Sequence, residues 1–207
     1  MRLLLVRHGQ SMGNSNGVIQ GHLDFELSEL GWRQARATAR RLSDERVDRV
    51  VSSPLRRATD TAGLIAASLG LEVETDAALL EYNIGIIAGL TGAEVRNRHP
   101  EIVEAYRRGE RPVLPGEEGR DVFLKRVVGA LDLFRDSGQT VLAVAHGGVI
   151  GAFCYTALGL DYRLPGMFEV ANCSITEITV DRSGRLVLQR HNDTCHLGEL
   201  TTVMDSG

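Results

Sequence analysis

The chain alternates short apolar runs with longer stretches in which apolar residues recur every three or four positions. Short apolar runs bounded by polar residues are typical of buried strands, and the longer spacing is typical of helices that cover a sheet. The runs predict strands at residues 3–6, 48–52, 71–75 and 141–145. The longer patterns predict helices at residues 27–42, 53–69, 122–134 and 149–158. This order predicts an α/β fold, a three-layer sandwich with a mainly parallel central sheet and helices on both faces.

Local signals refine three of these boundaries. Ser28 is a suitable N-cap for the first long helix, and Leu27 and Trp32 stand at the positions of a hydrophobic staple. Ser53 followed by Pro54 predicts the start of the next helix, with Ser53 as N-cap. Residues 174–191 predict a terminal hairpin that turns at the Ser-Gly pair of positions 183 and 184.

Residues 81–119 are less regular than the rest of the chain. They contain two short helical patterns, at 91–98 and 101–108, followed by the turn-rich RPVLPGEEG. We expect a small cap-like insertion over the sheet rather than a separate domain, so that residues 1–207 form one domain.

Residues 141–160, VLAVAHGGVIGAFCYTALGL, are apolar enough to raise the question of a membrane span. His146 and the following Gly-Gly pair interrupt the run in its middle. A strand, a glycine turn and a buried helix explain this pattern better, so we expect no membrane partner.

The composition excludes several classes of protein. The chain is 43% hydrophobic and 24% charged with a net charge of -4, which is ordinary for a globular protein and does not indicate nucleic-acid binding. Cys154, Cys173 and Cys195 are scattered and odd in number, which argues against a disulfide framework or a thiolate zinc site. Together with the absence of a recognisable secretion signal, the cysteines predict a cytoplasmic protein.

Several chemically active residues follow the predicted strands, and ligands of such sheets bind at the carboxyl ends of the strands. These residues are Arg7, His8, Ser11 and Asn14 after the first strand, Arg56 and Arg57 after the second, Glu81 after the third, and His146 and Gly147 after the fourth. Arginines and glycine-rich turns bind phosphoryl oxygens, and a histidine can carry a phosphoryl group covalently. No aspartate-rich cluster accompanies them, so we expect neither a metal nor another cofactor.

Each of these residues also has a plainer interpretation. His8 or His146 alone would more often be a hydrogen-bonded framework residue. Arg56 would be a surface residue, Glu81 a solvated loop acid, and Ser11 and Asn14 turn formers. The two histidines together, each at a strand end and each before a glycine, favour a catalytic site.

These motifs resemble the histidine phosphatase superfamily, the phosphoglycerate-mutase-like proteins. The segment LLLVRHGQSMGN resembles the signature of that family around its first histidine. Further segments resemble family motifs in the same order along nearly the whole chain: DFELSELGWRQA, SSPLRRATDTA, LLEYNIG, PGEEGRDVFLKR and VLAVAHGG.

The resemblance implies roles for individual residues. His8 would be the phosphorylated nucleophile, and Glu81 the proton donor. The phosphoryl group and the rest of the substrate would be bound by Arg7, Arg57 and His146, by Asn14 and Ser11, by the backbone around Gly147, and by Gln20 and Gly21. The neighbouring arginines would keep His8 uncharged, because cations disfavour imidazolium.

The implied activity is metal-independent hydrolysis of a small phosphorylated metabolite through a phosphohistidine. The alternatives are a cofactor-dependent phosphoglycerate mutase with the same chemistry and a non-catalytic phospho-ligand module. The modest insertion favours access of water, and so the hydrolase. The stretch NIGIIAGLTGAE departs from the usual family pattern, with Ile86 where an aromatic residue is common, which leaves the substrate open.

Some features stay open at this stage. Five arginines of the insertion would contact either solvent or a second anionic group of the substrate: Arg96, Arg98, Arg107, Arg108 and Arg111. His191, Cys195 and His196 could suggest a metal site, but their spacing matches no strong pattern. His22 would either line the entrance of the site or have a structural role in its own loop. His99 would stand at the end of a helix. A symmetric homodimer is the common arrangement among oligomers, and nothing in the sequence decides the oligomeric state.

Overall fold

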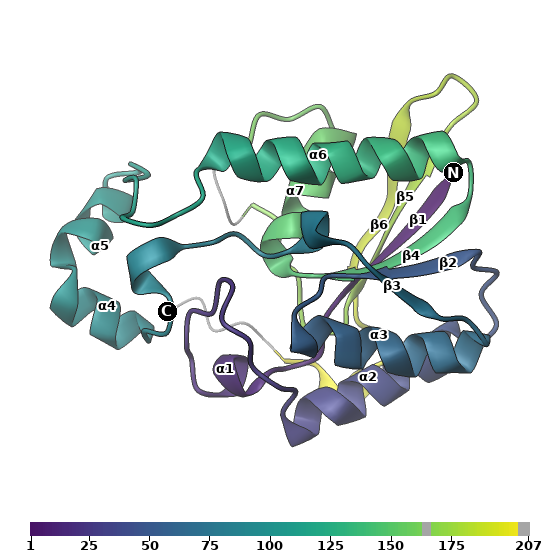
Figure 1. Cartoon of the computed structure of the whole chain (residues 1–207), viewed down its shortest axis with the longest axis horizontal. Coiled ribbons are helices and arrows are strands. Elements are labelled where there is room, and N and C mark those ends of the chain that lie inside the picture. The colour runs from purple at the N-terminus through teal and green to yellow at the C-terminus, as the bar shows by residue number, and fades with distance from the viewer. Residues whose placement is uncertain (163–166, 203–207) are drawn as a thin grey trace.

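The computed structural model describes residues 1–162 and 167–202. Within these residues the strands form a six-stranded sheet in the order β3-β2-β4-β1-β5-β6 (Figure 1). The strands are β1 (Arg2–Arg7), β2 (Arg49–Ser52), β3 (Val73–Thr75), β4 (Thr140–Ala145), β5 (Ile175–Val180) and β6 (Leu186–Asp193).

The pairing of the strands confirms a mainly parallel sheet. β1 lies parallel to β4, β4 to β2, and β2 to β3, with Leu4 opposite Leu142 in the central pair. Only β5 and β6 run antiparallel, as a hairpin added at the edge beside β1. The hairpin turns where the sequence predicts, between Val180 and Leu186.

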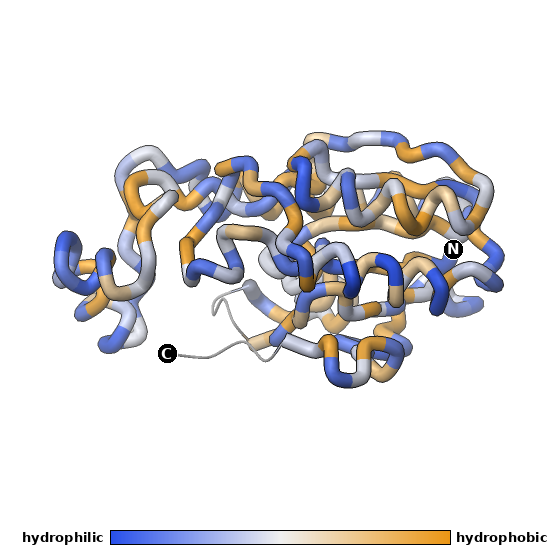
Figure 2. The backbone as a smooth tube through the Cα atoms, turned by 90° about the horizontal axis from the view of Figure 1, so that it is seen from below, coloured by the Kyte–Doolittle hydropathy of each residue, from blue (hydrophilic) through white to orange (hydrophobic). Residues whose placement is uncertain are grey.

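Helices cover both faces of the sheet, as predicted. On one face, alternate residues of the central strands pack with α6 (Arg120–Ser137) and α7 (Gly147–Ala157). On the other face, the intervening residues pack with α2 (Glu29–Leu42) and α3 (Arg56–Leu69). Hydrophobic and hydrophilic positions alternate along these helices, as expected for elements with one buried side (Figure 2).

The start of α2 agrees with the sequence, but the start of α3 does not. The Ser28 hydroxyl accepts the Gly31 N–H at 3.0 Å and caps α2. The helix α3 begins at Arg56 rather than at residue 53, and its first N–H is donated to the Asp24 carboxylate at 2.7 Å. The prediction of Ser53 as N-cap was wrong, because its hydroxyl bonds a histidine instead.

The Gly-Gly pair at positions 147 and 148 was predicted as a turn, and this prediction was also wrong. Both glycines belong to the first turn of α7, whose N-cap is His146. The strand β4 therefore leads directly into a helix N-terminus, which presents backbone N–H groups at the strand end. None of the helices in the described residues is long and apolar enough to cross a membrane.

The segment 81–119 includes α4 (Gly92–Arg98) and α5 (Pro100–Arg107). It projects beyond the carboxyl ends of the parallel strands (Figure 1). We call it the cap segment. It has its own apolar cluster, formed by Ile87, Val95, Ile102 and Leu114. His99 ends α4 and begins α5, in agreement with its predicted place at a helix end. Short helical turns complete the chain: α1 (Met12–Ser15), η1 (Ala77–Leu79), η2 (Gly85–Ile87) and η3 (Gly198–Leu200).

Candidate active site

A cavity of about 440 Å³ lies between the carboxyl ends of the parallel strands and the cap segment. It brings together residues that lie far apart along the chain. Of the residues predicted from the sequence, it is lined by Arg7, His8, Asn14, Gln20, Gly21, Arg57 and Glu81. Three predicted residues do not line the cavity: Ser11, His146 and Gly147. The His146 ring nevertheless lies next to that of His8.

His8 follows the last residue of β1 and is held in one tautomer. Its Nδ1 lies 2.7 Å from the carbonyl oxygen of Gly9. A carbonyl only accepts hydrogen bonds, so Nδ1 carries the proton and Nε2 keeps its lone pair. Burial, and then the charges of Arg7 and Arg57, hold the His8 pKa well below its ordinary 6.5. The side chain is therefore a neutral imidazole at neutral pH, with Nε2 free to act as a nucleophile.

His146 follows the last residue of β4, and its ring centroid lies 5.1 Å from that of His8. The Ser53 hydroxyl lies 2.7 Å from His146 Nε2 and also receives the Leu55 N–H at 3.4 Å. The hydroxyl can either donate to Nε2 or accept from it, and in both cases it orients the imidazole ring. Nδ1 has no partner among the described residues. Burial, followed by the charges around it, lowers the His146 pKa well below 6.5.

Arg7 and Arg57 bring two buried cations to the same cavity. The Arg57 guanidinium donates to the carbonyl oxygens of Leu23 at 2.7 Å and Gly21 at 2.9 Å. Arg7 donates to the carbonyl oxygen of Val170. Burial lowers the Arg57 pKa to about 10, so it stays charged at neutral pH. Two guanidinium groups fixed by backbone carbonyls form a rigid binding site for an anion.

Glu81 is held at the N-terminus of α7. Its carboxylate accepts the Gly148 N–H at 3.1 Å and the Tyr82 N–H at 2.9 Å. A Cβ on Gly148 would displace the Glu81 carboxylate from this position. Gly148, which directly follows the predicted Gly147, lines the cavity.

Arg126, on α6, fixes the backbone that carries Glu81. Its guanidinium donates to the carbonyl oxygens of Ala78 at 2.9 Å, Leu80 at 2.6 Å and Glu81 at 2.9 Å. It also pairs with the Glu118 carboxylate at 2.8 Å. The sequence places Arg126 in a helix that carries a family motif, but it does not predict these hydrogen bonds. His22 Nε2 lies 2.6 Å from the same Glu81 carbonyl oxygen, so His22 stabilises the loop beside the cavity.

Ser11 and Asn14 form a polar network at one wall. Ser11 caps the short helix α1, and its hydroxyl lies 3.0 Å from Asn14 Oδ1 and 2.8 Å from Gln20 Oε1. Asn172, from the connector before β5, donates to the His8 carbonyl at 3.0 Å and lies 3.4 Å from Asn14 Oδ1. Ser11 therefore holds the Asn14 side chain in place without lining the cavity. The sequence did not predict Asn172, because no motif contains it.

The remaining candidates lie elsewhere. Of the five cap-segment arginines, only Arg111 lines the cavity, whereas Arg98 and Arg108 pair with glutamates at the surface. His191 contacts Cys154 and Thr176, and His196 lies 3.0 Å from Thr38. In the parts of the chain that the structure describes, no three His, Cys, Asp or Glu side chains gather as a metal site would require.

Comparison with known proteins agrees with this geometry. Residues 3–194 match the model of the histidine phosphatase superfamily (branch 1). The chain is 35% identical to phosphoserine phosphatase 1 of Hydrogenobacter thermophilus over 96% of this chain and 95% of the relative. It is also 35% identical to phosphoglycerate mutase-like protein 4 of Arabidopsis thaliana, over 99% and 90% of the two chains.

Among solved structures, the mycobacterial glucosyl-3-phosphoglycerate phosphatase is 33% identical and superimposes with a TM-score of 0.82, covering 93% of this chain and 99% of that one. The chain therefore belongs to the histidine phosphatase superfamily, which confirms the resemblance seen in the sequence. It is an enzyme that hydrolyses phosphate monoesters of small molecules, and a mutase is less favoured.

Proposed function

We propose that this enzyme hydrolyses its phosphate ester in two steps, through a phosphohistidine on His8. The observation that carries the proposal is the His8 tautomer. The Gly9 carbonyl holds the proton on Nδ1, and the cavity lies beside a neutral imidazole whose Nε2 keeps its lone pair.

In the first step Nε2 of His8 attacks phosphorus, and the bond from phosphorus to the ester oxygen breaks. Glu81 gives its proton to the leaving alkoxide. Negative charge spreads over three phosphoryl oxygens, which Arg7, Arg57 and His146 stabilise. Asn14 contributes a further amide from the wall of the cavity.

In the second step a water molecule attacks the same phosphorus from the face that the alcohol has left. The Glu81 carboxylate takes a proton from this water, and the bond between phosphorus and Nε2 breaks. Inorganic phosphate leaves, His8 returns to its neutral tautomer, and Glu81 is protonated again. Neither step uses a metal.

We propose a single domain over residues 1–207, with the cap segment as its insertion, and a cytoplasmic location. Free thiols at Cys154, Cys173 and Cys195 support a reducing compartment. The substrate would be a small phosphorylated metabolite.

The two-step route is tested by trapping the intermediate. The protein is mixed briefly with p-nitrophenyl phosphate in the presence of a chelator and then quenched in alkali, in which phosphohistidine survives. We expect mass spectrometry to find one added phosphoryl group on His8, together with steady release of phosphate. Turnover that requires added metal, or phosphate release with no phosphorylated His8 at any time, would contradict the proposal.

The mutase alternative is tested separately with 3-phosphoglycerate and a trace of the bisphosphate. We expect free phosphate as the main product. Rapid formation of 2-phosphoglycerate with little free phosphate would show that the phosphoryl group returns to the substrate instead of to water.

A further inference from the structure

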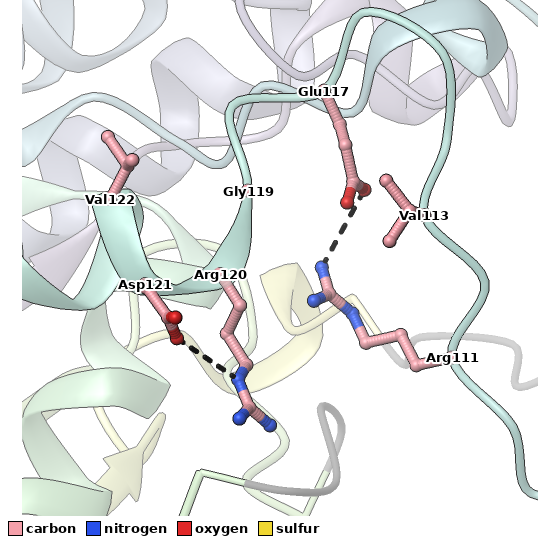
Figure 3. Close-up of a pocket in the computed structure, with 7 residues that line it drawn as sticks. All are labelled: Arg111, Val113, Glu117, Gly119, Arg120, Asp121 and Val122. Atoms are coloured by element: carbon pink, nitrogen blue, oxygen red, sulfur yellow. Dashed lines mark ion pairs between the residues drawn. The ribbon is translucent and has the colours of Figure 1, made fainter.

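The cap side of the cavity contains an ion pair that the chemistry at His8 does not use. Arg111 and Glu117 point toward each other, with 3.9 Å between guanidinium nitrogen and carboxylate oxygen (Figure 3). Only 5% of the Glu117 side chain is exposed, against 25% of Arg111. Both residues line the active-site cavity, and both also line a neighbouring cavity of about 370 Å³. The pair therefore contributes to the walls of both cavities.

The backbone around Glu117 is fixed by a close approach within the cap segment. Gly85 has a φ of 61° and packs directly on the turn formed by Pro115 and Gly116, where a Cβ would collide. Ile84 forms a bridge with Glu117 next to this contact. The carboxylate is thus presented from a rigid turn rather than from a free loop.

Arg111 is also held in place, on the face of an aromatic ring. Its guanidinium carbon lies 4.9 Å from the centroid of the Tyr82 ring, the distance of a cation–π contact. Stacked on Tyr82 and facing Glu117, the guanidinium has its positive charge already compensated before any substrate enters.

The other residues on this side of the cavity carry no net charge. Tyr82, Tyr106 and Tyr162 supply phenol groups, and Ile84 and Leu114 supply apolar surface. Burial raises the Tyr162 pKa to about 12 and also raises the pKa of Tyr82, so both phenols stay protonated. Protonated phenols donate and accept hydrogen bonds, and their rings pack against C–H groups.

We propose that Glu117 is a specificity-determining residue that cancels the charge of Arg111, so that the cavity selects phosphate esters of neutral, hydroxyl-bearing alcohols over esters whose alcohol part carries a carboxylate. The inference rests on the phosphatase function proposed above. A carboxylate that approached Arg111 would meet the charge of Glu117, and two like charges around one cation are disfavoured. A hydroxyl group meets no such repulsion, because it can donate to Glu117 and accept from Arg111.

The test compares two substrates that differ only at the end far from the phosphate. Glycerol 3-phosphate ends in a hydroxymethyl group, and 3-phosphoglycerate ends in a carboxylate. The measured quantity is kcat/KM for 3-phosphoglycerate divided by kcat/KM for glycerol 3-phosphate, because this ratio cancels general losses of activity. We expect a ratio below one in the unmodified protein.

Two variants should move the ratio in opposite directions. Glu117→Gln uncovers the positive charge of Arg111 and should raise the ratio about tenfold, and Arg111→Gln leaves Glu117 unopposed and should lower it about tenfold. If the pair only supported the fold, its loss would change kcat/KM for both substrates by the same factor and leave the ratio constant. Glu110→Gln is the matched control, because Glu110 pairs with Arg108 at the surface of the same segment. It should keep the ratio of the unmodified protein.

Three results would overturn the inference: a ratio above one in the unmodified protein, a constant ratio in both variants, or faster turnover of phosphoserine than of glycerol 3-phosphate. Hydrolysis of p-nitrophenyl phosphate, measured on the same preparations, separates the two claims. If this ester is hydrolysed and the ratio does not move, only the specificity inference is wrong. If none of the esters is hydrolysed, the proposed function and the inference are both wrong.

Discussion

The cavity has two ends that differ in construction. At the sheet end, Arg57 and His146 are each 1% exposed, and their contacts run to backbone carbonyls and a buried hydroxyl. At the cap end, Tyr106 is 44% exposed, and the Arg111 side chain is 25% exposed. The sheet end is part of the hydrophobic core of the molecule, whereas the cap end rests on a small apolar cluster of its own.

This difference shows how one fold can keep its chemistry and vary its substrates. Groups that touch the phosphoryl group must be fixed to fractions of an ångström, and burial at strand ends achieves this. Groups that contact the leaving alcohol lie on a segment that can change without disturbing the sheet. The experiments below test whether the two ends act separately, beginning with the change of largest effect.

Replacing the nucleophile should have the largest effect. His8→Asn removes Nε2 and should lower kcat by at least about 10⁴-fold for every ester, without changing the order of preference among esters. Steady-state kinetics with p-nitrophenyl phosphate and glycerol 3-phosphate would measure this. Substantial activity in the variant toward either ester would mean that another group attacks the phosphorus.

Replacing one fixed guanidinium should have the next largest effect. Arg57→Lys loses the planar fork that spans the Leu23 and Gly21 carbonyls and that would bind the phosphoryl oxygens, so kcat/KM should fall about 10²- to 10³-fold. The neighbouring Arg56 is exposed and pairs with acidic side chains at the surface. Arg56→Lys should therefore keep the activity of the unmodified protein, and equal losses in both variants would contradict the assignment.

Acid should destabilise the sheet end. In the folded protein the pKa values of His8 and His146 lie well below 6.5, mainly because both rings are buried. Below about pH 6.5 the unfolded chain binds protons at these residues and the folded chain does not. The free energy of unfolding should then fall as the pH falls, by up to about 1.4 kcal/mol per pH unit for each histidine.

Thermal unfolding between pH 7.5 and 5, in buffers without phosphate, would measure this effect. His8→Asn should show a shallower decline of Tm than the unmodified protein, because one of the two buried imidazoles is gone. An equal decline in both proteins would show that the acid sensitivity arises elsewhere.

The smallest change removes one hydroxyl behind the site. Ser53→Ala deletes the hydroxyl that is hydrogen-bonded to His146 Nε2 and should lower kcat about tenfold, with a smaller effect on KM. Ser52→Ala is the control, since the Ser52 hydroxyl bonds only the backbone carbonyl of its neighbour. If both variants kept full activity, His146 would be oriented by packing alone.

The same two ends differ in how far the sequence predicts them. His8 and His146 directly follow strands, Arg7 is the last residue of β1, and Arg57 lies in the first turn of the helix after β2. The rule that strand ends meet at one sheet edge therefore brings them together. Ser53 was assigned to a helix cap because a serine before proline suits that role, and only the fold reveals the histidine beside it. Asn172 lies more than 160 residues from His8 and carries no motif.

At the cap end the sequence predicts less. It gives five arginines without showing which one turns inward, because that depends on how α4, α5 and the 111–119 turn pack. The contact of Gly85 with Pro115, which orients Glu117, joins residues 30 positions apart and has no periodic signal. The sequence also misplaces the starts of α3 and α7, which begin at Arg56 and Gly147.

The contacts of the Arg126 guanidinium have a consequence for protein engineering. One guanidinium binds the Glu81 carbonyl and the Glu118 carboxylate, and so holds both ends of the intervening segment at a single point. Residues 82–117 are therefore a natural unit for transplantation. A segment from a related enzyme could be joined at these two anchors, leaving the reactive centre intact while the recipient acquires the donor's choice of alcohol.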